Sequence, residues 1–227
     1  MPGVKENIDQ LASKWVSIRA VTSMRKHWLI ALLLFAQGCW AQTWLLQQQD
    51  EGVTLWVRPH PPGSFVEMRL EMLVTASPLT LLDVLRDTEN HQVWLPESHE
   101  VRLLARPSAN EDIVYTLLSA PWPLEDRELI TRSLLTRAVD CTLSLKVWAV
   151  PDVLVPHVGL KRIRISKGVW EAIPQPNGST LIRLQSYTNP GDNLPGWLVN
   201  PVATKAAVRS FKAIRQLMEA KPAHPCS

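Results

Sequence analysis

The chain has 227 residues, of which 46% are hydrophobic and 20% charged, a composition typical of one folded domain that excludes a disordered chain. The formal net charge of +3 arises near the N-terminus, because residues 1–41 hold five of the 24 basic residues and two of the 21 acidic ones. The remaining residues carry no net charge. Nucleic-acid binding through a basic face therefore has no support in the composition.

The segment that begins at Met24 has the pattern of a secretory signal peptide. A short basic stretch precedes an apolar run from Trp28 to Phe35, which is too short to span a bilayer comfortably, and small residues follow. We expect residues 1–23 to be an upstream mis-start and residues 24–41 to be removed by cleavage after Ala41. Cys39 gives a faint likeness to a lipoprotein box without its usual leucine, so lipid anchoring there is the lesser alternative.

The expected mature domain, residues 42–227, contains two cysteines, Cys141 and Cys226. Export to an oxidising compartment permits a disulfide, but two cysteines do not make a disulfide framework. We therefore expect no essential bridge between them.

The first half of this domain contains strand and helix signals in turn. Residues 44–49 suggest a remnant of a helix, residues 50–52 a turn and residues 53–57 a strand. Strict alternation of apolar and charged residues over 66–74 predicts a strand with one buried face. Ser77 and Pro78 have the cap pattern of a helix over residues 79–85, and a second short helix is expected over residues 87–94.

The second half is dominated by strand signals and ends in a helix. We expect strands over residues 101–105, 113–118, 129–135, 142–150, 162–166, 168–173 and 180–184. Asn177-Gly178 predicts a hairpin turn before the last of these. After a loop at residues 189–196, residues 202–220 have helical spacing, with an apolar stripe through Ala207, Phe211, Ile214 and Met218. We interpret the basic face of this helix as solvated rather than bound to anionic lipid.

This order of elements predicts an α+β fold in which a curved antiparallel sheet packs against a long C-terminal helix. A strongly bent sheet of this kind leaves an apolar space between sheet and helix. Ten tryptophans against three phenylalanines suit the wall of such a cavity, although most of them are expected in the ordinary core.

With this order established, the chain resembles the START (steroidogenic-acute-regulatory-related lipid-transfer) domains, particularly exported bacterial ones. The motifs that carry the resemblance span nearly all of residues 44–220 in the family's order: Trp56-Val57-Arg58, Trp94-Leu95-Pro96, Ile113-Val114-Tyr115, Pro121-Trp122-Pro123, Asp126-Arg127-Glu128, Gly168-Val169-Trp170, Asn189-Pro190-Gly191 and Leu194 to Asn200. Asp192 and Glu128 depart from the family's common residues at their positions.

The resemblance implies a helix-grip fold that encloses one cavity for a lipid such as a sterol or phospholipid. It further implies non-catalytic binding or transfer of that hydrophobic ligand. We expect an exported monomer in a bacterial periplasm, without cofactor or metal and in contact with membranes only transiently. The residues that we expect as candidates for the cavity are Met68, Met72, Trp94, Tyr115, Trp122, Arg127, Trp170, Phe211 and Met218. For Arg127 we expect a structural ion pair near the cavity, with ligand contact as the lesser alternative.

No catalytic motif supports an enzyme, since the chain lacks the common nucleophile, zinc-protease and dinucleotide patterns. His91 and His99 flank Glu97, but their spacing is not a recognised metal-ligand pattern. Two alternatives remain open: a helix-grip enzyme of the cyclase or hydrolase type, and a cofactor chaperone that uses the same cavity. Ligand entry is expected to need movement of the C-terminal helix or of a neighbouring loop, with residues 189–196 as the candidate hinge.

Overall fold

The computed structural model describes residues 43–61, 63–122, 124–191 and 194–222. The expected signal peptide, lipoprotein cysteine and upstream mis-start lie outside the described residues. Among the helices of the described part, none is long and apolar enough to cross a membrane.

One ten-stranded sheet forms the body of the domain, with the order β1-β2-β3-β10-β9-β7-β6-β5-β4 along its main path. The strands of this path pair antiparallel, and the short β8 pairs parallel with β6 off the path. The bounds are β1 (Leu45–Asp50), β2 (Val53–Pro59), β3 (Val66–Val74), β4 (Ser98–Ser108), β5 (Glu111–Leu118), β6 (Arg127–Arg137), β7 (Leu143–Ala149), β8 (Lys161–Arg162), β9 (Ile165–Pro174) and β10 (Thr180–Asn189).

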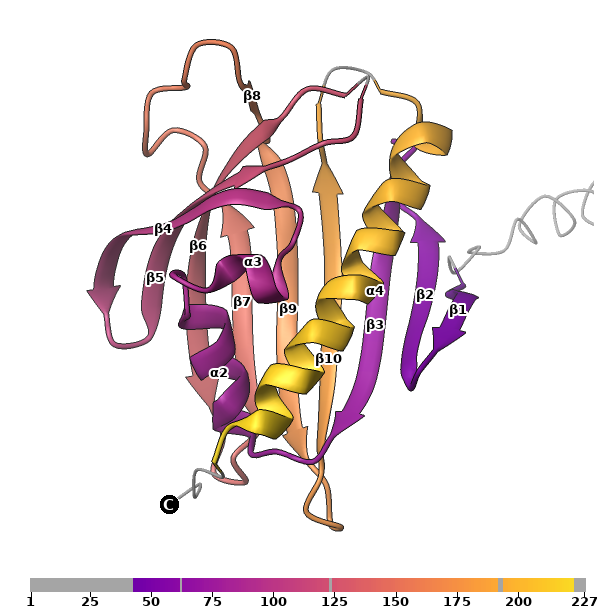
Figure 1. Cartoon of the computed structure of the whole chain (residues 1–227), viewed down its shortest axis with the longest axis vertical. Coiled ribbons are helices and arrows are strands. Elements are labelled where there is room, and N and C mark those ends of the chain that lie inside the picture. Colours follow the sequence, from indigo (N-terminus) through magenta and orange to yellow (C-terminus); the bar gives the residue numbers. More distant parts are fainter. Residues whose placement is uncertain (1–42, 62, 123, 192–193, 223–227) are drawn as a thin grey trace, which may run out of the picture. The chain divides into compact units, whose positions relative to one another are not determined.

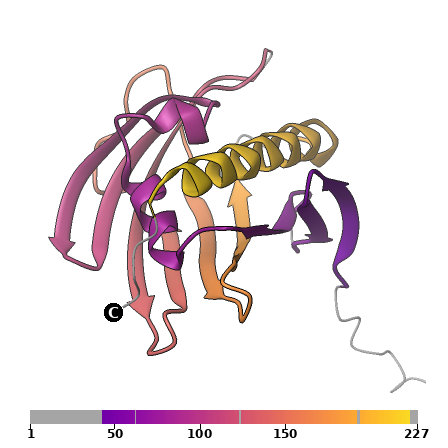
Figure 2. The same cartoon turned by 60° about the horizontal axis from the view of Figure 1, so that its bottom comes forward.

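The long helix α4 (Gly196–Ala220) runs across this sheet, and two shorter helices, α2 (Pro78–Arg86) and α3 (His91–Trp94), lie beside it (Figure 1). Figure 2 shows the sheet curving around α4. Strands β2 and β3 supply alternate side chains to the core, and α4 supplies one face. The core residues include Leu55, Leu70, Met72, Ile182, Phe211, Ile214 and Met218. This is the predicted helix-grip arrangement, and the fold prediction is confirmed.

Two local signals gave the expected elements. The Ser77 side chain accepts a hydrogen bond from the Leu79 backbone N–H at 3.4 Å, and Pro78 opens α2. Gly178 lies in the turn between β9 and β10 with a φ of 82°, a conformation that glycine adopts without strain. The alternating segment at residues 66–74 is β3 with the predicted bounds.

The prediction of a helical remnant at residues 44–49 was wrong. These residues form β1, which pairs with β2 through a tight hairpin whose central residues, Glu51 and Gly52, both have positive φ. Except for Asp50, all residues of β1 are exposed, so its sequence carries no alternation of apolar and polar residues.

Other boundaries also differ from the expectation, and several strands, such as β4 and β10, are longer than expected. Helix α3 covers only His91–Trp94, because Asp87 ends α2 and its carboxylate accepts a hydrogen bond from the backbone N–H of Asn90. Helix α4 begins at Gly196, six residues before the expected start, and contains Pro201. The segment expected as a strand at residues 162–166 is divided between β8 and β9.

Cys141 lies just before β7 with a φ of 68° and is disulfide-bonded. Its partner lies outside the described residues, which contain no second cysteine. The sequence had led us to expect no essential bridge.

Candidate functional site

An internal cavity of about 340 Å³ lies between the curved sheet and α4. Sheet residues such as Leu118, Trp170 and Leu184 line one wall, and α4 lines the opposite wall. Most lining residues are apolar, and the only ionisable side chains among the described lining residues are Glu97 and Arg127. The volume falls at the lower end of the range of about 300–1,000 Å³ that is common for ligand pockets.

The size of the α4 side chains explains where the cavity lies. Ala203, Ala206 and Ala207 line it from the N-terminal half of the helix, where their short side chains leave space above the sheet. Phe211 and Met218, in the C-terminal half, are almost completely buried and fill the same space with side-chain volume. The cavity therefore opens beneath the first half of α4.

Aromatic rings close the inner part of the cavity. The rings of Trp170 on β9 and Phe211 on α4 stack, with centroids 5.4 Å apart and planes 13° from parallel. Trp94 also lines the cavity, and its indole N–H donates to the Asp87 carbonyl at 3.2 Å. Because that donor is satisfied within the chain, the Trp94 ring can present an apolar surface to a ligand.

Four of the predicted cavity residues, Trp94, Arg127, Trp170 and Phe211, line the cavity. Met72 and Met218 belong instead to the solid core, where the second half of α4 packs on the sheet, and Met68 packs against that core. These three methionines do not line the cavity.

The other two predicted residues lie elsewhere for different reasons. Tyr115 is buried, but its ring contacts the His157 ring edge-on at 5.7 Å, away from the cavity lining. Burial, together with Glu128 and Glu100, raises the pKa of the Tyr115 phenol, so the hydroxyl stays protonated at neutral pH. Trp122 is 93% exposed at the tip of the β5–β6 connection.

Arg127 is buried at the mouth of the cavity, and it fixes two chain segments there. Its Nε donates to the Pro190 carbonyl at 3.1 Å, and its Nη1 donates to the Glu125 carbonyl. The neighbouring Asp126 accepts a hydrogen bond from the Ala120 N–H at 3.0 Å and lies 3.1 Å from His99 Nε2. The expected ion pair of Arg127 stays a prediction.

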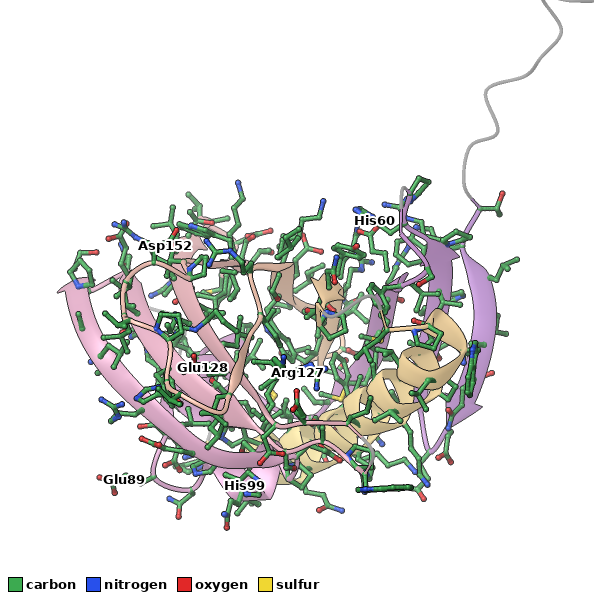
Figure 3. The ribbon with its side chains drawn as sticks, turned by 90° about the horizontal axis from the view of Figure 1, so that it is seen from above. His60, Glu89, His99, Arg127, Glu128 and Asp152 are labelled. Atoms are coloured by element: carbon green, nitrogen blue, oxygen red, sulfur yellow. The ribbon has the colours of Figure 1, made fainter. Side chains whose placement is uncertain are left out.

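The next residue, Glu128, anchors a long loop on the opposite side of β6. Its side chain is fully buried, and its carboxylate lies 2.8 Å from Arg162 Nη2 and 2.7 Å from His157 Nδ1. Arg162 also donates to the Leu154 carbonyl at 2.9 Å. Figure 3 shows Arg127 on the side of α4 and Glu128 beneath the loop between β7 and β8.

Burial alone would raise the pKa of the Glu128 carboxyl, but the hydrogen bonds from His157 and Arg162 outweigh it and hold the pKa below its ordinary value. The sequence analysis used Glu128 only as a family marker and did not find this cluster. The signal available was weak, since His157 and Arg162 follow Glu128 by 29 and 34 residues.

Large apolar side chains are exposed at the cavity end of the domain, on the β5–β6 connection, the first turn of α4 and the β7–β8 loop. Trp122 lies between the lining residues Pro121 and Leu124, and Trp197 lies between Leu194 and Val199, which also line the cavity. The loop that Glu128 anchors exposes Val155 and Val158. Figure 1 shows these connections at the top of the view.

The histidines near Glu97 serve other partners. His91 Nδ1 lies 2.7 Å from the Ser98 hydroxyl, and His99 pairs with Asp126. Across the part of the chain that the structure describes, no group of three or more His, Cys, Asp or Glu side chains is arranged to hold a metal ion.

No family model matches the chain. Known proteins nevertheless are similar to it in sequence and in fold. A STAR-related lipid transfer protein from Xanthomonas axonopodis superposes with a TM-score of 0.71 and 29% identity, covering 77% of this chain and 98% of that one. Human START domain-containing protein 10 is 30% identical over 202 residues, which cover 84% of this chain and 68% of the human protein.

The phosphatidylcholine transfer protein of mouse is 25% identical over 174 residues, covering 74% of this chain and 79% of that protein. These similarities agree with the helix-grip sheet, the long α4 and the enclosed apolar cavity. The chain belongs to the START domain family.

Proposed function

We propose that the protein binds a hydrophobic lipid in the cavity between the sheet and α4, and transfers it without chemical change. The observation that carries the proposal is the almost wholly apolar lining of the cavity in a chain of this family. Binding at such a site lowers the free energy of a water-insoluble molecule roughly in proportion to the apolar surface that is removed from water.

The lining favours binding over catalysis. Both of its ionisable residues have partners within the chain: Glu97 pairs with Arg209 through Oε1, leaving Oε2 buried without a partner, and Arg127 donates to the carbonyls of Pro190 and Glu125. A helix-grip enzyme would need a nucleophile or a general base that reaches the substrate. Among the described lining residues, no such pair lies within hydrogen-bond distance.

Transfer requires contact with a bilayer, and the cavity mouth is suited to it. Trp122 and Trp197 are 93% and 77% exposed, and tryptophan is the side chain that favours the membrane interface. Val155 and Val158 extend the apolar surface on the neighbouring loop. We propose that this end of a monomer meets the membrane transiently.

Opening is proposed at the N-terminal half of α4. Polar contacts hold this half in place: the Asn200 side chain donates to the Ser64 carbonyl at 3.1 Å and accepts from the Val66 N–H at 3.3 Å. Residues 189–196, which precede the helix, supply the hinge. We further propose export to a bacterial periplasm; the mass of the mature N-terminus tests cleavage before Gln42 against an acylated Cys39.

Transfer between vesicles tests the function. Donor vesicles contain a self-quenching fluorescent lipid, and the full chain is expected to raise the rate at which its fluorescence appears in acceptor vesicles. Ala206→Trp fills the cavity and should abolish this rise, while Lys205→Trp places the same side chain on the exposed face of α4 and should retain it. Equal rates for the two variants would contradict transport in the cavity.

A further inference from the structure

Five polar residues line the otherwise apolar cavity, and three of them are already engaged within the chain. Glu97 pairs with Arg209 through Oε1, while its Oε2 is buried and has no hydrogen-bond partner among the described residues. Arg127 donates to two carbonyl groups. The Thr188 hydroxyl lies 2.9 Å from the Ser166 hydroxyl. Ser119 and Ser210 remain, and neither side-chain hydroxyl hydrogen-bonds to any described residue.

Both serines are half-buried. Neither hydroxyl is among the polar atoms of the described residues that are fully buried without a hydrogen-bond partner, so a ligand can reach both. A hydroxyl in an apolar cavity lacks the hydrogen bonds that water would supply, and a partner that restores one lowers the free energy. The two hydroxyls, together with Glu97 Oε2 beside them, are therefore the groups on the described lining that a ligand's polar end can satisfy.

The backbone of Glu97 connects the two serines. The Glu97 carbonyl accepts a hydrogen bond from the Ser119 N–H at 2.8 Å, and the Glu97 carboxylate pairs with Arg209, the residue before Ser210. Ser119 follows β5 and Ser210 lies on α4. The two hydroxyls thus belong to opposite walls of the cavity, in the corner where Glu97 joins the sheet to the helix.

This corner suits an uncharged polar end. Each serine hydroxyl can donate one hydrogen bond and accept another, which matches an alcohol group on a ligand. A phosphate-bearing head group would have to leave water for apolar walls and approach the Glu97 carboxylate, and this is unfavourable. The small cavity volume also favours a compact lipid over a phospholipid with two long chains.

We infer that the cavity takes a compact, uncharged lipid with a hydroxyl at its polar end, held between Ser119 and Ser210. This inference rests on the proposed function and adds the class of ligand. Because Ser210 lies on α4, the bound hydroxyl joins the moving helix to the sheet. The ligand thereby stabilises the closed position of α4.

A matched pair of lipids tests this inference. Hexadecan-1-ol and hexadecyl methyl ether differ at the polar end, since the ether accepts a hydrogen bond but donates none. The full chain is incubated with dioleoylphosphatidylcholine vesicles that contain equal amounts of the alcohol and the ether. Native mass spectrometry then measures which lipid the protein retains. We expect the alcohol to exceed the ether by roughly tenfold, as for a site that hydrogen-bonds a ligand hydroxyl.

The variants Ser119→Ala and Ser210→Ala should each lower the alcohol-to-ether ratio, and the double variant should lower it further. All three variants should still take up the ether, which shows that the cavity is intact. Thr188→Val is the control, because its hydroxyl already has a chain partner, and it should keep the wild-type ratio.

Four results would overturn the inference. Equal retention of alcohol and ether by the wild-type chain removes the hydroxyl preference, and an unchanged ratio in the double serine variant removes the two serines from it. Retention of dioleoylphosphatidylcholine in place of both probes would contradict an uncharged ligand while leaving the proposed function intact. Retention of no lipid would contradict both.

Discussion

Trp170 of β9 and Phe211 of α4 stack across the inner end of the cavity, with their ring centroids 5.4 Å apart. This contact joins the two walls where the large side chains of α4 give way to alanines. On its inner side the space between sheet and helix is filled, and on its outer side the cavity opens. The stacked pair is therefore both part of the core and the end wall of the site.

Truncation of Phe211 should measure the contribution of this contact. Its side chain is 1% exposed, so Phe211→Ala should lower the free energy of unfolding by about 3–5 kcal/mol. Phe211→Leu keeps most of the apolar volume and should cost less. Urea denaturation measures both variants; a loss well under 1 kcal/mol for the alanine variant would contradict the tight packing.

The start of α4 depends on a close approach of two backbones. A Cβ atom at Gly196 would lie 2.1 Å from the Ser64 carbonyl oxygen, which is closer than real contacts allow. Gly196→Ala should therefore shift the helix start and destabilise the protein by about 1–3 kcal/mol. Gly63→Ala meets ordinary contacts and should be nearly neutral. Thermal unfolding separates the two, and equal melting temperatures would count against this approach.

Removal of the Glu128 charge should free the loop between β7 and β8. Arg162 is almost completely buried beside Glu128, so Glu128→Gln leaves a buried cation without its counter-charge and should cost about 3–5 kcal/mol. Hydrogen exchange should rise at residues 151–160. Asp152→Asn removes an exposed ion pair in the same loop and should have little effect. Unchanged exchange in Glu128→Gln would show that the loop is held by other contacts.

Acid should destabilise the protein through the same carboxyl. For Glu128, as for Glu67 and Glu71, hydrogen bonds from neighbouring side chains outweigh burial and lower the pKa from the ordinary value of 4.5. A lowered pKa in the folded state stabilises the protein above the unfolded value, and this stabilisation is lost as the pH falls through the folded value.

Urea denaturation across this pH range measures the effect. The free energy of unfolding should fall as the pH drops below 4.5, and Glu128→Gln should show a shallower fall. The same slope in both proteins would mean that the Glu128 pKa is not lowered.

Exposed tryptophan at the mouth should govern attachment to vesicles. Trp122→Ala should reduce binding of the full chain to phosphatidylcholine vesicles several-fold, because its ring no longer enters the interface. Val139 is also fully exposed, but it lies in the β6–β7 turn at the opposite end of the domain, so Val139→Ala should bind like the wild type. Sedimentation with vesicles compares them, and equal losses would contradict docking through the mouth.

The sequence predicted those parts of the fold that have local causes. The alternation along β3 and the Asn177-Gly178 turn depend on neighbouring residues, and both were found. β1 was missed because it is exposed on both faces. The start of α4 was missed because the apolar stripe that indicated the helix begins later, at Ala207, whereas the helix begins at Gly196. Contacts of Gly196 and Asn200 with the β2–β3 loop hold those first helical turns, and such contacts are not visible in a local pattern.

The same distinction applies to the site. Trp170 and Phe211 could be expected in the cavity because large aromatic residues occur on the inner face of a strand and a helix. Periodicity assigns Met72 and Met218 to that face too. It does not show whether a residue on the face lies at the cavity or in the packed core, where these two methionines are found. The Glu128–Arg162 pair forms only when the loop folds back on β6, so the sequence alone could not reveal it.

The most direct test of lipid binding is native mass spectrometry of the full chain as purified, compared with Ala206→Trp and Lys205→Trp. We predict one bound lipid in the wild type and in Lys205→Trp, because both keep the cavity of about 340 Å³. Ala206→Trp should be empty. A wild-type chain that carries no lipid and takes up none from vesicles, or an Ala206→Trp chain that carries the same lipid, would contradict the proposal that the cavity holds it.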